Sequence, residues 1–97
     1  MRYVVIFKAQ IKSLDEHYSQ MAQKLRNSAL QQYHCQHFES LTEHNTEIAL
    51  SYWNTLADIQ AWRQDAEHIV AQTLGQSTWY TCFSVDVCEI LRHYQTN

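Results

Sequence analysis

The sequence predicts an α+β domain with the element order β-α-β-β-α-β, in which an antiparallel four-stranded sheet carries both helices on one face. Three observations predict it. Segments 3–10, 34–53 and 79–91 are rich in β-branched and aromatic residues, and two stretches of helical periodicity separate them. The length of 97 residues fits a single domain, which we place over residues 1–97. This order is that of the ferredoxin-like arrangement.

The composition limits the classes of function. A formal net charge of -3 and a pI of about 6.0 provide no basic surface for a nucleic acid. One glycine and no proline argue against long disordered linkers. No stretch reaches the ~18 apolar residues of a membrane span, and the first residues lack the features of a secretion signal. We therefore expect a soluble, cytoplasmic protein with no nucleic-acid or membrane partner.

The cysteines fit that compartment. Cys35, Cys82 and Cys88 are odd in number and form no CxxC pair, so we expect reduced thiols that mostly pack as small apolar groups. His34, Cys35 and His37 resemble a metal cluster. On a strand, however, Cys35 and His37 would share a face while His34 points away, and a closed zinc site needs four ligands. We expect no metal site.

The first half of the chain predicts a strand and a helix. Residues 3–10 (YVVIFKAQ) are apolar on both alternating sets near their start, which is typical of a central strand. Ser13 and Glu16 have the spacing of a capping box. Residues then recur at helical spacing up to a helix end near Gln32. These are Leu14, Tyr18, Met21, Leu25 and Ala29.

The second half predicts two paired strands, a helix and a last strand. The strands of segment 34–53 meet at residues 43–46, where Asn45 tolerates the left-handed backbone of a tight turn. Thr55 and Asp58 repeat the capping-box spacing before a second helix, and Gly75 fits its C-terminal cap. The apolar stripe of this helix is Ile59, Trp62, Ala66, Ile69, Val70 and Thr73. The sheet face without helices needs cover, and packing against a second copy would give a homodimer.

With these residues the chain resembles the antibiotic biosynthesis monooxygenase (ABM) domain of the dimeric α+β barrel group. The resemblance covers nearly the whole chain, and its specific part is SYWNTLADIQAWRQDAEHIVAQTLGQSTWY, residues 51–80. Relatives similarly run Ser-Tyr-Trp, a capped short helix, Ala-Trp with a basic residue, a segment like Ala-Glu-His, then Gly and Trp-Tyr. The resemblance implies a homodimer of ferredoxin-like protomers, each with a cavity between its sheet and its helices.

The resemblance implies more than one chemistry. Some members oxygenate aromatic polyketides or oxidise quinols with molecular oxygen and without a metal, flavin or haem; others degrade haem, and many have no known activity. The haem-degrading members resemble one another in an Asn on the first strand, a Trp in the second helical region and a His ten residues later. Trp62 matches the Trp, but Gln72 replaces the His, and the first strand carries Phe7 and Lys8 and no Asn. The resemblance therefore disfavours a haem oxygenase.

Cofactor-free oxygenation requires a proton acceptor, donors for an oxyanion and a dry aromatic cavity. His68 is the candidate catalytic base, since an imidazole titrates near ~6.5. On one continuous helix it faces solvent, and it reaches a cavity only if the helix breaks around residues 64–65. Trp62 is either a stacking wall for a flat substrate, with its indole N–H as a donor, or a core residue.

Further aromatic side chains are candidates for substrate binding. They are Tyr52, Trp53, Tyr80 and Phe83. Trp53 and Tyr80 also fit packing or a dimer interface, and the hydroxyls of Tyr52 and Tyr80 could donate protons. Phe83 stands where many relatives have Tyr and Gln76 where they often have Arg, so two polar groups that could orient a substrate are missing. Asp86 fits a buried base, a sheet edge or a dimer contact.

The sequence thus predicts a cofactor-independent monooxygenase that oxidises an aromatic or quinol-like small molecule with O2 as co-substrate. A non-catalytic, ligand-binding or stress-related dimer of the same fold is the alternative. A pocket with a reachable base would favour the enzyme, whereas a cavity plugged by side chains, with His68 in solvent, would favour the alternative.

Overall fold

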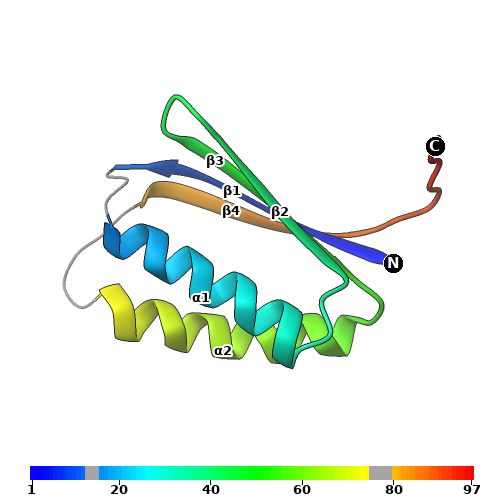
Figure 1. The fold of residues 1–97 in the computed structure, drawn as a ribbon, viewed down its shortest axis with the longest axis horizontal. Coiled ribbons are helices and arrows are strands. Elements are labelled where there is room, and N and C mark those ends of the chain that lie inside the picture. The colour runs from blue at the N-terminus through cyan, green and yellow to red at the C-terminus, as the bar shows by residue number, and fades with distance from the viewer. Residues whose placement is uncertain (13–15, 75–79) are drawn as a thin grey trace.

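A computed structural model describes residues 1–12, 16–74 and 80–97, with the backbone alone for residues 17, 71–74, 80 and 81. Its elements are β1 (Tyr3–Ile11), α1 (Glu16–Gln32), β2 (His37–Glu43), β3 (Thr46–Trp53), α2 (Leu56–Leu74) and β4 (Tyr80–Glu89). The strands pair antiparallel in the order β2-β3-β1-β4, so β1 is central as predicted. Both helices lie on one face of the sheet (Figure 1). The predicted ferredoxin-like α+β fold is confirmed.

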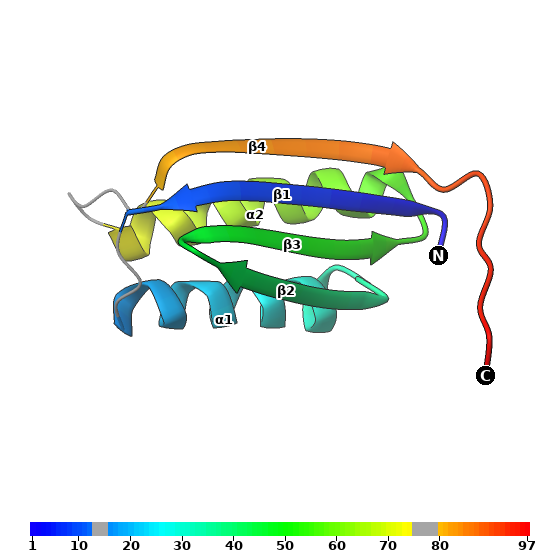
Figure 2. The ribbon, with the colours of Figure 1, turned by 90° about the horizontal axis from the view of Figure 1, so that it is seen from above.

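The two faces of the sheet differ because side chains alternate along each strand. We call the face that carries Val5, Ala9 and Ile11 of β1 the inner face, and these side chains are buried beneath the helices. Ser51 and Trp53 of β3 pair with inner-face residues of β1 and are buried with them. Among residues 1–12, 16–74 and 80–97, no helix lies on the opposite, outer face. Seen from above it, α2 runs under β1 and the gap between β1 and β4, and α1 runs along the β2 edge (Figure 2).

A cluster of three rings joins the sheet to both helices. Trp53 has no exposed surface, and its ring centroid lies 5.4 Å from that of Trp62 on α2. Phe38 of β2 meets Trp62 edge-on at 6.3 Å. The Trp53 indole N–H donates to the Ser51 hydroxyl at 2.8 Å, and the Trp62 indole N–H donates to the Leu25 carbonyl of α1 at 3.3 Å. Trp53 is thus buried and Trp62 half-buried, and each indole N–H has a hydrogen-bond acceptor.

A second cluster closes the opposite end of the same layer. Ile11, Tyr18 and Met21 are buried there, and three half-buried side chains pack against them: Leu25, Ile69 and Val70. Between the clusters, the Ser28 hydroxyl of α1 donates to the Asp65 carboxylate of α2 at 2.8 Å. The apolar stripes predicted for both helices therefore face the core, as far as their side chains are described. None of the described helical segments has the length and apolarity that a bilayer span requires.

Two predicted chain signals are confirmed at atomic detail. The Thr55 hydroxyl accepts the Asp58 backbone N–H at 3.1 Å, which caps the start of α2. His44 and Asn45 have φ angles of 50° and 65°, so the β2–β3 hairpin turns through two left-handed residues. Three predicted boundary residues lie outside the described residues: Ser13, Gly75 and Trp79.

The second strand begins later than the prediction from residue 34. His34 has a φ of 66°, a left-handed conformation that interrupts an extended backbone, and β2 starts at His37. Cys35 therefore does not share a strand face with His37. It is buried in the cluster of Trp53, and its thiol donates to the His37 carbonyl at 3.3 Å.

Replacing Trp53 with alanine should destabilise the domain strongly. The substitution removes a fully buried indole and leaves a cavity between the sheet and α2, which costs about 3–5 kcal/mol. Leu56→Ala is the matched control, because Leu56 is more than half exposed and its loss should cost below about 1 kcal/mol. Denaturant unfolding followed by circular dichroism measures both. Equal losses in the two variants would contradict the central position given to Trp53.

Candidate functional site

The helices leave the inner face of β4 uncovered. Phe83, Val85 and Val87 each pair with an inner-face residue of β1, so their side chains point to the helix side of the sheet. They are nevertheless 63%, 52% and 51% exposed. Within the described residues, α2 packs on α1 and β3 and makes few contacts with β4. The flank of the sheet between β4 and α2 is therefore open and apolar.

A groove of about 250 Å³ lies along this flank. Its lining residues are Leu56, Ile59, Gln60 and Arg63 of α2 and Val87 of β4, and we call it the α2–β4 groove. The walls are apolar, while Gln60 and Arg63 bring an amide and a guanidinium to the rim. The Arg63 side chain also donates from Nε to the Glu67 carboxylate at 3.4 Å. An apolar hollow with a few polar groups at its edge is the usual form of a small-molecule site.

Trp62 lies in the core and not in the lining of this groove. It is half-buried against Trp53 and Phe38, and its N–H is engaged by the Leu25 carbonyl. It belongs to the same packed cluster as Ile59, whose side chain borders the groove. Trp62 is therefore placed to shape the groove through Ile59.

His68 faces solvent. The helix α2 runs unbroken from Leu56 to Leu74, without the break at residues 64–65 that would turn His68 toward a cavity. Asp65 instead points to α1, where it accepts the hydrogen bond of Ser28. His68 lies one turn beyond the exposed Gln64, on the side of α2 away from the core.

The other predicted site residues lie on different surfaces. Tyr52 is on the outer face, where its ring lies 5.8 Å from that of His37. Trp53 is in the core, and Phe83 flanks the open side of the sheet, 5.9 Å from the ring of Phe7. Tyr80 pairs with Ile11 through the backbone of β4, and its side chain is outside the described ones. Asp86 is exposed on the outer face.

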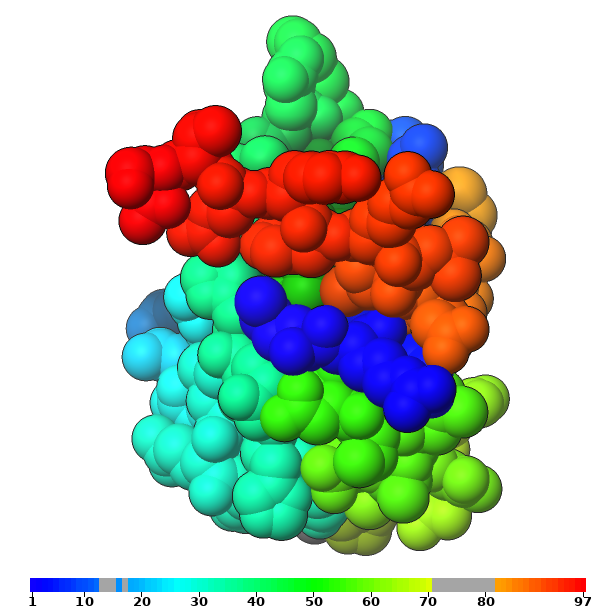
Figure 3. Space-filling view, turned by 90° about the vertical axis from the view of Figure 1, so that its right-hand side faces the viewer, coloured from blue at the N-terminus to red at the C-terminus, as the bar shows by residue number. Residues whose placement is uncertain are grey.

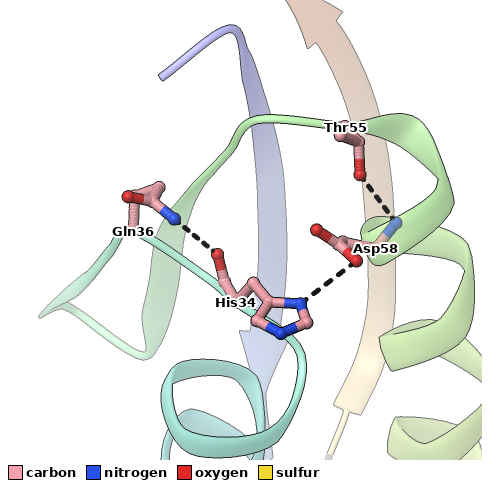
Figure 4. A network of polar contacts seen from close by, with 4 residues as sticks. All are labelled: His34, Gln36, Thr55 and Asp58. Carbon is pink, nitrogen blue, oxygen red and sulfur yellow. Dashed lines mark hydrogen bonds and ion pairs between the residues drawn. The ribbon is translucent and has the colours of Figure 1, made fainter.

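The segment of His34, Cys35 and His37, which resembles a metal cluster in the sequence, connects the two helices in the structure. His34 Nδ1 lies 3.3 Å from the Asp58 carboxylate and joins the end of α1 to the start of α2 (Figure 4). The Gln36 amide caps the His34 carbonyl at 2.8 Å. Over residues 1–12, 16–74 and 80–97, no group of three His, Cys, Asp or Glu side chains converges as metal ligands would.

The cysteines follow the prediction in part. All three are free thiols. Burial raises the pKa of the Cys35 thiol, so this group stays protonated and packs as an apolar residue. Cys82, by contrast, is exposed on the outer face and does not pack as predicted.

Glu47 is a candidate group that the motif search missed. Its side chain is only 8% exposed on the inner face, opposite Ala9 of β1 and Thr42 of β2. Burial raises the pKa of its carboxyl, and no described side chain or backbone N–H donates a hydrogen bond to it. Its alternation with Ala49 and Ser51, which are buried on the same face, is the sequence signal that could have found it.

The groove residues were missed for a different reason. Three groove residues of α2 lie beside its core stripe at helical spacing: Leu56, Gln60 and Arg63. This position predicts a solvent-exposed edge of the helix and no binding site. Val85 and Val87 alternate as a buried strand face does. Only the lateral position of β4, outside the cover of α2, makes the two sets face each other across open space.

Comparison with known proteins places this structure among related folds. No family model matches the chain. The uncharacterized protein YqjZ of Bacillus subtilis is 32% identical over 91 residues, which cover 93% of this chain and 80% of YqjZ.

Solved structures share the fold at low sequence identity. A Nitrosomonas europaea protein of unknown function superposes with a TM-score of 0.73 and 9% identity over 99% of this chain and 95% of its own. A candidate antibiotic biosynthesis monooxygenase from the same organism has a TM-score of 0.71 and 14% identity over 93% and 99%. A variant of MhuD with two manganese protoporphyrin IX molecules bound per active site has a TM-score of 0.60 and 14% identity over 96% and 99%.

Glu47→Gln should change how stability depends on pH. In the wild type the folded-state pKa of Glu47 is raised above 4.5, so the folded protein holds a proton that the unfolded chain releases. Its free energy of unfolding therefore falls as pH rises from about 4.5 through the raised folded-state pKa. The Gln variant has no carboxyl to titrate, so its stability does not fall in this way. Relative to the wild type, its free energy of unfolding should rise by about 1 kcal/mol between about pH 4 and pH 8.

Denaturant titrations of both proteins across this pH range measure the difference. Glu43→Gln is the control, because Glu43 is exposed at the hairpin and should show no such pH-dependent gain. A constant difference between Glu47→Gln and the wild type at all pH values would show that Glu47 is not desolvated in solution.

Proposed function

Because this chain belongs to the same family as Bacillus subtilis YqjZ and has an antibiotic biosynthesis monooxygenase-like domain, we propose that it is a cofactor-independent monooxygenase. Its substrate would be an aromatic or quinol-like small molecule, and O2 its co-substrate. The observation that carries the proposal is the α2–β4 groove, which combines apolar walls with Gln60 and Arg63 at its rim.

The groove suits a flat, partly apolar molecule with an oxygen at one edge. Ile59 and Val87 would contact the ring faces, and the exposed inner face of β4 would extend the contact toward Phe83. Gln60 and Arg63 would donate hydrogen bonds to a phenolate or enolate oxygen. Such donors favour the ionised substrate, which is the form that passes an electron to oxygen.

The reaction needs no external reductant when the substrate itself supplies the electrons. An anthrone-type CH2 group and O2 give a carbonyl and one water molecule, and a hydroquinone and O2 give a hydroxyquinone and one water molecule. In both cases the substrate supplies two hydrogens and the electrons, one oxygen atom enters the product, and the other leaves as water. The protein has to bind, orient and deprotonate the substrate.

Two groups are candidates for the proton acceptor. His68 has the suitable chemistry, but from the solvent side of α2 it would exchange protons with a bound substrate only through water. Glu67 accepts a hydrogen bond from Arg63, which lines the groove, and offers a carboxylate one helical turn farther along α2. The predicted stacking role of Trp62 becomes an indirect one in this proposal, since Trp62 supports Ile59 from within the core.

We also propose that two copies pack through their outer faces. The middle of this face is apolar, although neither α1 nor α2 covers it. Its apolar side chains are Val4, Ile6, Ile48, Leu50 and Tyr52. Covering this face would bury apolar area that the protomer leaves in contact with water.

A non-catalytic ligand-binding protein is the second candidate. It is favoured by the dispersal of the predicted site residues: Tyr52 lies on the outer face and His68 on the solvent side of α2. Such a protein would use the same groove to bind an aromatic molecule without turning it over.

Filling the groove should abolish oxygen consumption. The wild type should consume O2 above the autoxidation rate with a panel of anthrones and naphthohydroquinones, measured with an oxygen electrode. Val87→Trp places an indole in the groove and should lower this rate by roughly 10²-fold. Gln64→Trp introduces the same side chain at an exposed position of α2 and should retain the rate.

Two further variants test individual residues in the same assay. Trp62→Ala should also lose activity, and His68→Ala decides whether His68 is the base.

Two results would contradict the enzymatic proposal. Uptake at the autoxidation rate with every substrate, together with saturable binding of the same compounds, would support the ligand-binding alternative. Equal activity of Val87→Trp and Gln64→Trp would place the reaction outside the groove.

Haem chemistry can be tested separately. Since Gln72 replaces the His of haem-degrading relatives and the first strand has no Asn, we expect hemin titration to give no saturable Soret shift. A stoichiometric shift, with loss of the Soret band upon addition of a reductant, would instead support a haem-degrading activity.

A further inference from the structure

We propose that β4 pairs edge to edge with β4 of a second copy, antiparallel about Val85, and that Phe83 of the second copy completes the α2–β4 groove. The edge contact is independent of the outer-face contact proposed above, whereas the role of Phe83 in ligand binding rests on the proposed function. Three observations carry the inference: the open backbone edge of β4, the order of side chains along this strand, and the missing wall of the groove.

The two edges of the sheet differ in how they are covered. At one edge, α1 runs along β2, and the Arg26 guanidinium donates to the Phe38 carbonyl at 3.2 Å. The other edge is β4, and among the described elements β1 alone pairs with it. The end-on view of Figure 3 shows β4 (orange) at the outline of the molecule. The edge of β4 is therefore accessible to another strand.

The ladder between β1 and β4 determines which backbone groups of β4 point outward. Ile90 N–H donates to the Arg2 carbonyl, so the hydrogen-bonded positions of β4 are those in step with Ile90. Val85 and Val87 lie at the alternate positions. Their N–H and C=O groups therefore point away from β1, which is the backbone pattern that pairs with a further strand.

β4 also lacks the features that keep edge strands apart. Its ten residues, YTCFSVDVCE, include no Lys, Arg or Pro. Phe83, Val85 and Val87 are each more than half exposed on its inner face. An added strand would supply both what the open backbone requires and what these apolar side chains require.

The side chains of β4 select one register with two-fold symmetry. Pairing about Val85 places Phe83 opposite Val87 of the second copy, so apolar residues meet on the inner face. It also places Asp86 opposite Ser84, where a hydroxyl can donate to the carboxylate. Pairing about Asp86 would oppose two carboxylates, which is destabilising, and pairing about Ser84 would leave Val87 without an apolar partner.

The same register brings the cysteines of β4 together. Cys82 of one copy lies opposite Cys88 of the other, and both thiols are free. Both residues are in step with Ile90 and bond toward β1, so across the new edge they form non-hydrogen-bonded pairs. The Cα atoms of such a pair lie ~4.5 Å apart, a separation that a disulfide can bridge. The two thiols therefore report the register.

A second copy in this position adds a wall to the groove. Val87 lines the groove on its β4 side, and the flank beyond is open. A two-fold axis normal to the sheet keeps the inner faces of both copies on the same side. Phe83 of the second copy then lies beside Val87. A flat aromatic molecule in the groove would gain a ring contact that one protomer does not supply.

Oxidation of the native thiols tests the register. Diamide takes up two electrons and two protons from a pair of thiols, and it should link the folded wild type into covalent dimers. Cys82→Ser and Cys88→Ser should each give at least tenfold fewer dimers, because the remaining thiol of β4 then faces a serine. A mixture of the two variants should restore the dimers. Cys35 is buried and should not compete.

Two results would overturn the proposed register. Either variant alone could give as many dimers as the mixture, which would mean that like cysteines meet. The mixture could also give no dimers, which would mean that the two β4 edges do not pair.

A charge at the two-fold axis tests the edge contact by a second route. Val85→Lys opposes two ammonium groups there and should lower the yield of diamide-linked dimers at least tenfold. Gln64→Lys adds the same charge at an exposed position of α2 and should leave the yield unchanged. Equal yields from the two variants would contradict pairing about Val85.

Ligand linkage tests the role of Phe83 of the second copy. If one ligand contacts both copies, its binding and the edge contact strengthen each other. A sulfonated anthraquinone should therefore raise the yield of diamide-linked dimers severalfold at low protein concentration. Saturable binding without a change in yield would overturn this role and leave the edge contact standing. If the compound does not bind, the proposed function fails, while the cysteine variants still decide the edge contact.

Discussion

The packing of Trp53 against Trp62 is the contact on which the rest of the structure depends. It buries the largest side chain of the sheet against α2, and the two indole N–H groups extend the contact to Ser51 and to the Leu25 carbonyl of α1. A domain of 97 residues has a thin core, so one such cluster determines where both helices sit. It lies on β3, next to the start of α2, and it therefore fixes how both helices pack on the sheet.

The open flank is a consequence of that position. With the helices held over one side of the sheet, the inner face of β4 keeps Phe83, Val85 and Val87 about half exposed or more, and the α2–β4 groove lies beside them. The same layering leaves the outer face bare. A single core contact thus accounts for both surfaces on which the proposed functions depend: one that takes a small aromatic molecule, and one that takes a second copy.

The fold could be predicted from the sequence because its signals are local: alternation, helical periodicity, the Thr55 cap and the Asn45 turn each act within a few residues. The predicted start of the second strand was wrong because the left-handed backbone of His34 cannot be predicted from composition.

The site could be predicted only in part. Solvent exposure of His68 followed from helix geometry, but the groove depends on how far α2 lies from β4, and this distance is set by the tertiary packing of Trp53 and Trp62.

Amide shift mapping in solution tests whether the α2–β4 groove binds a flat aromatic molecule. A sulfonated anthraquinone resembles a product of the proposed reaction and does not react further with O2. We expect saturable shifts confined to residues 56–63 of α2 and 83–87 of β4. Shifts confined to the outer face, or an absence of saturable shifts, would contradict the claim that this groove is the ligand site.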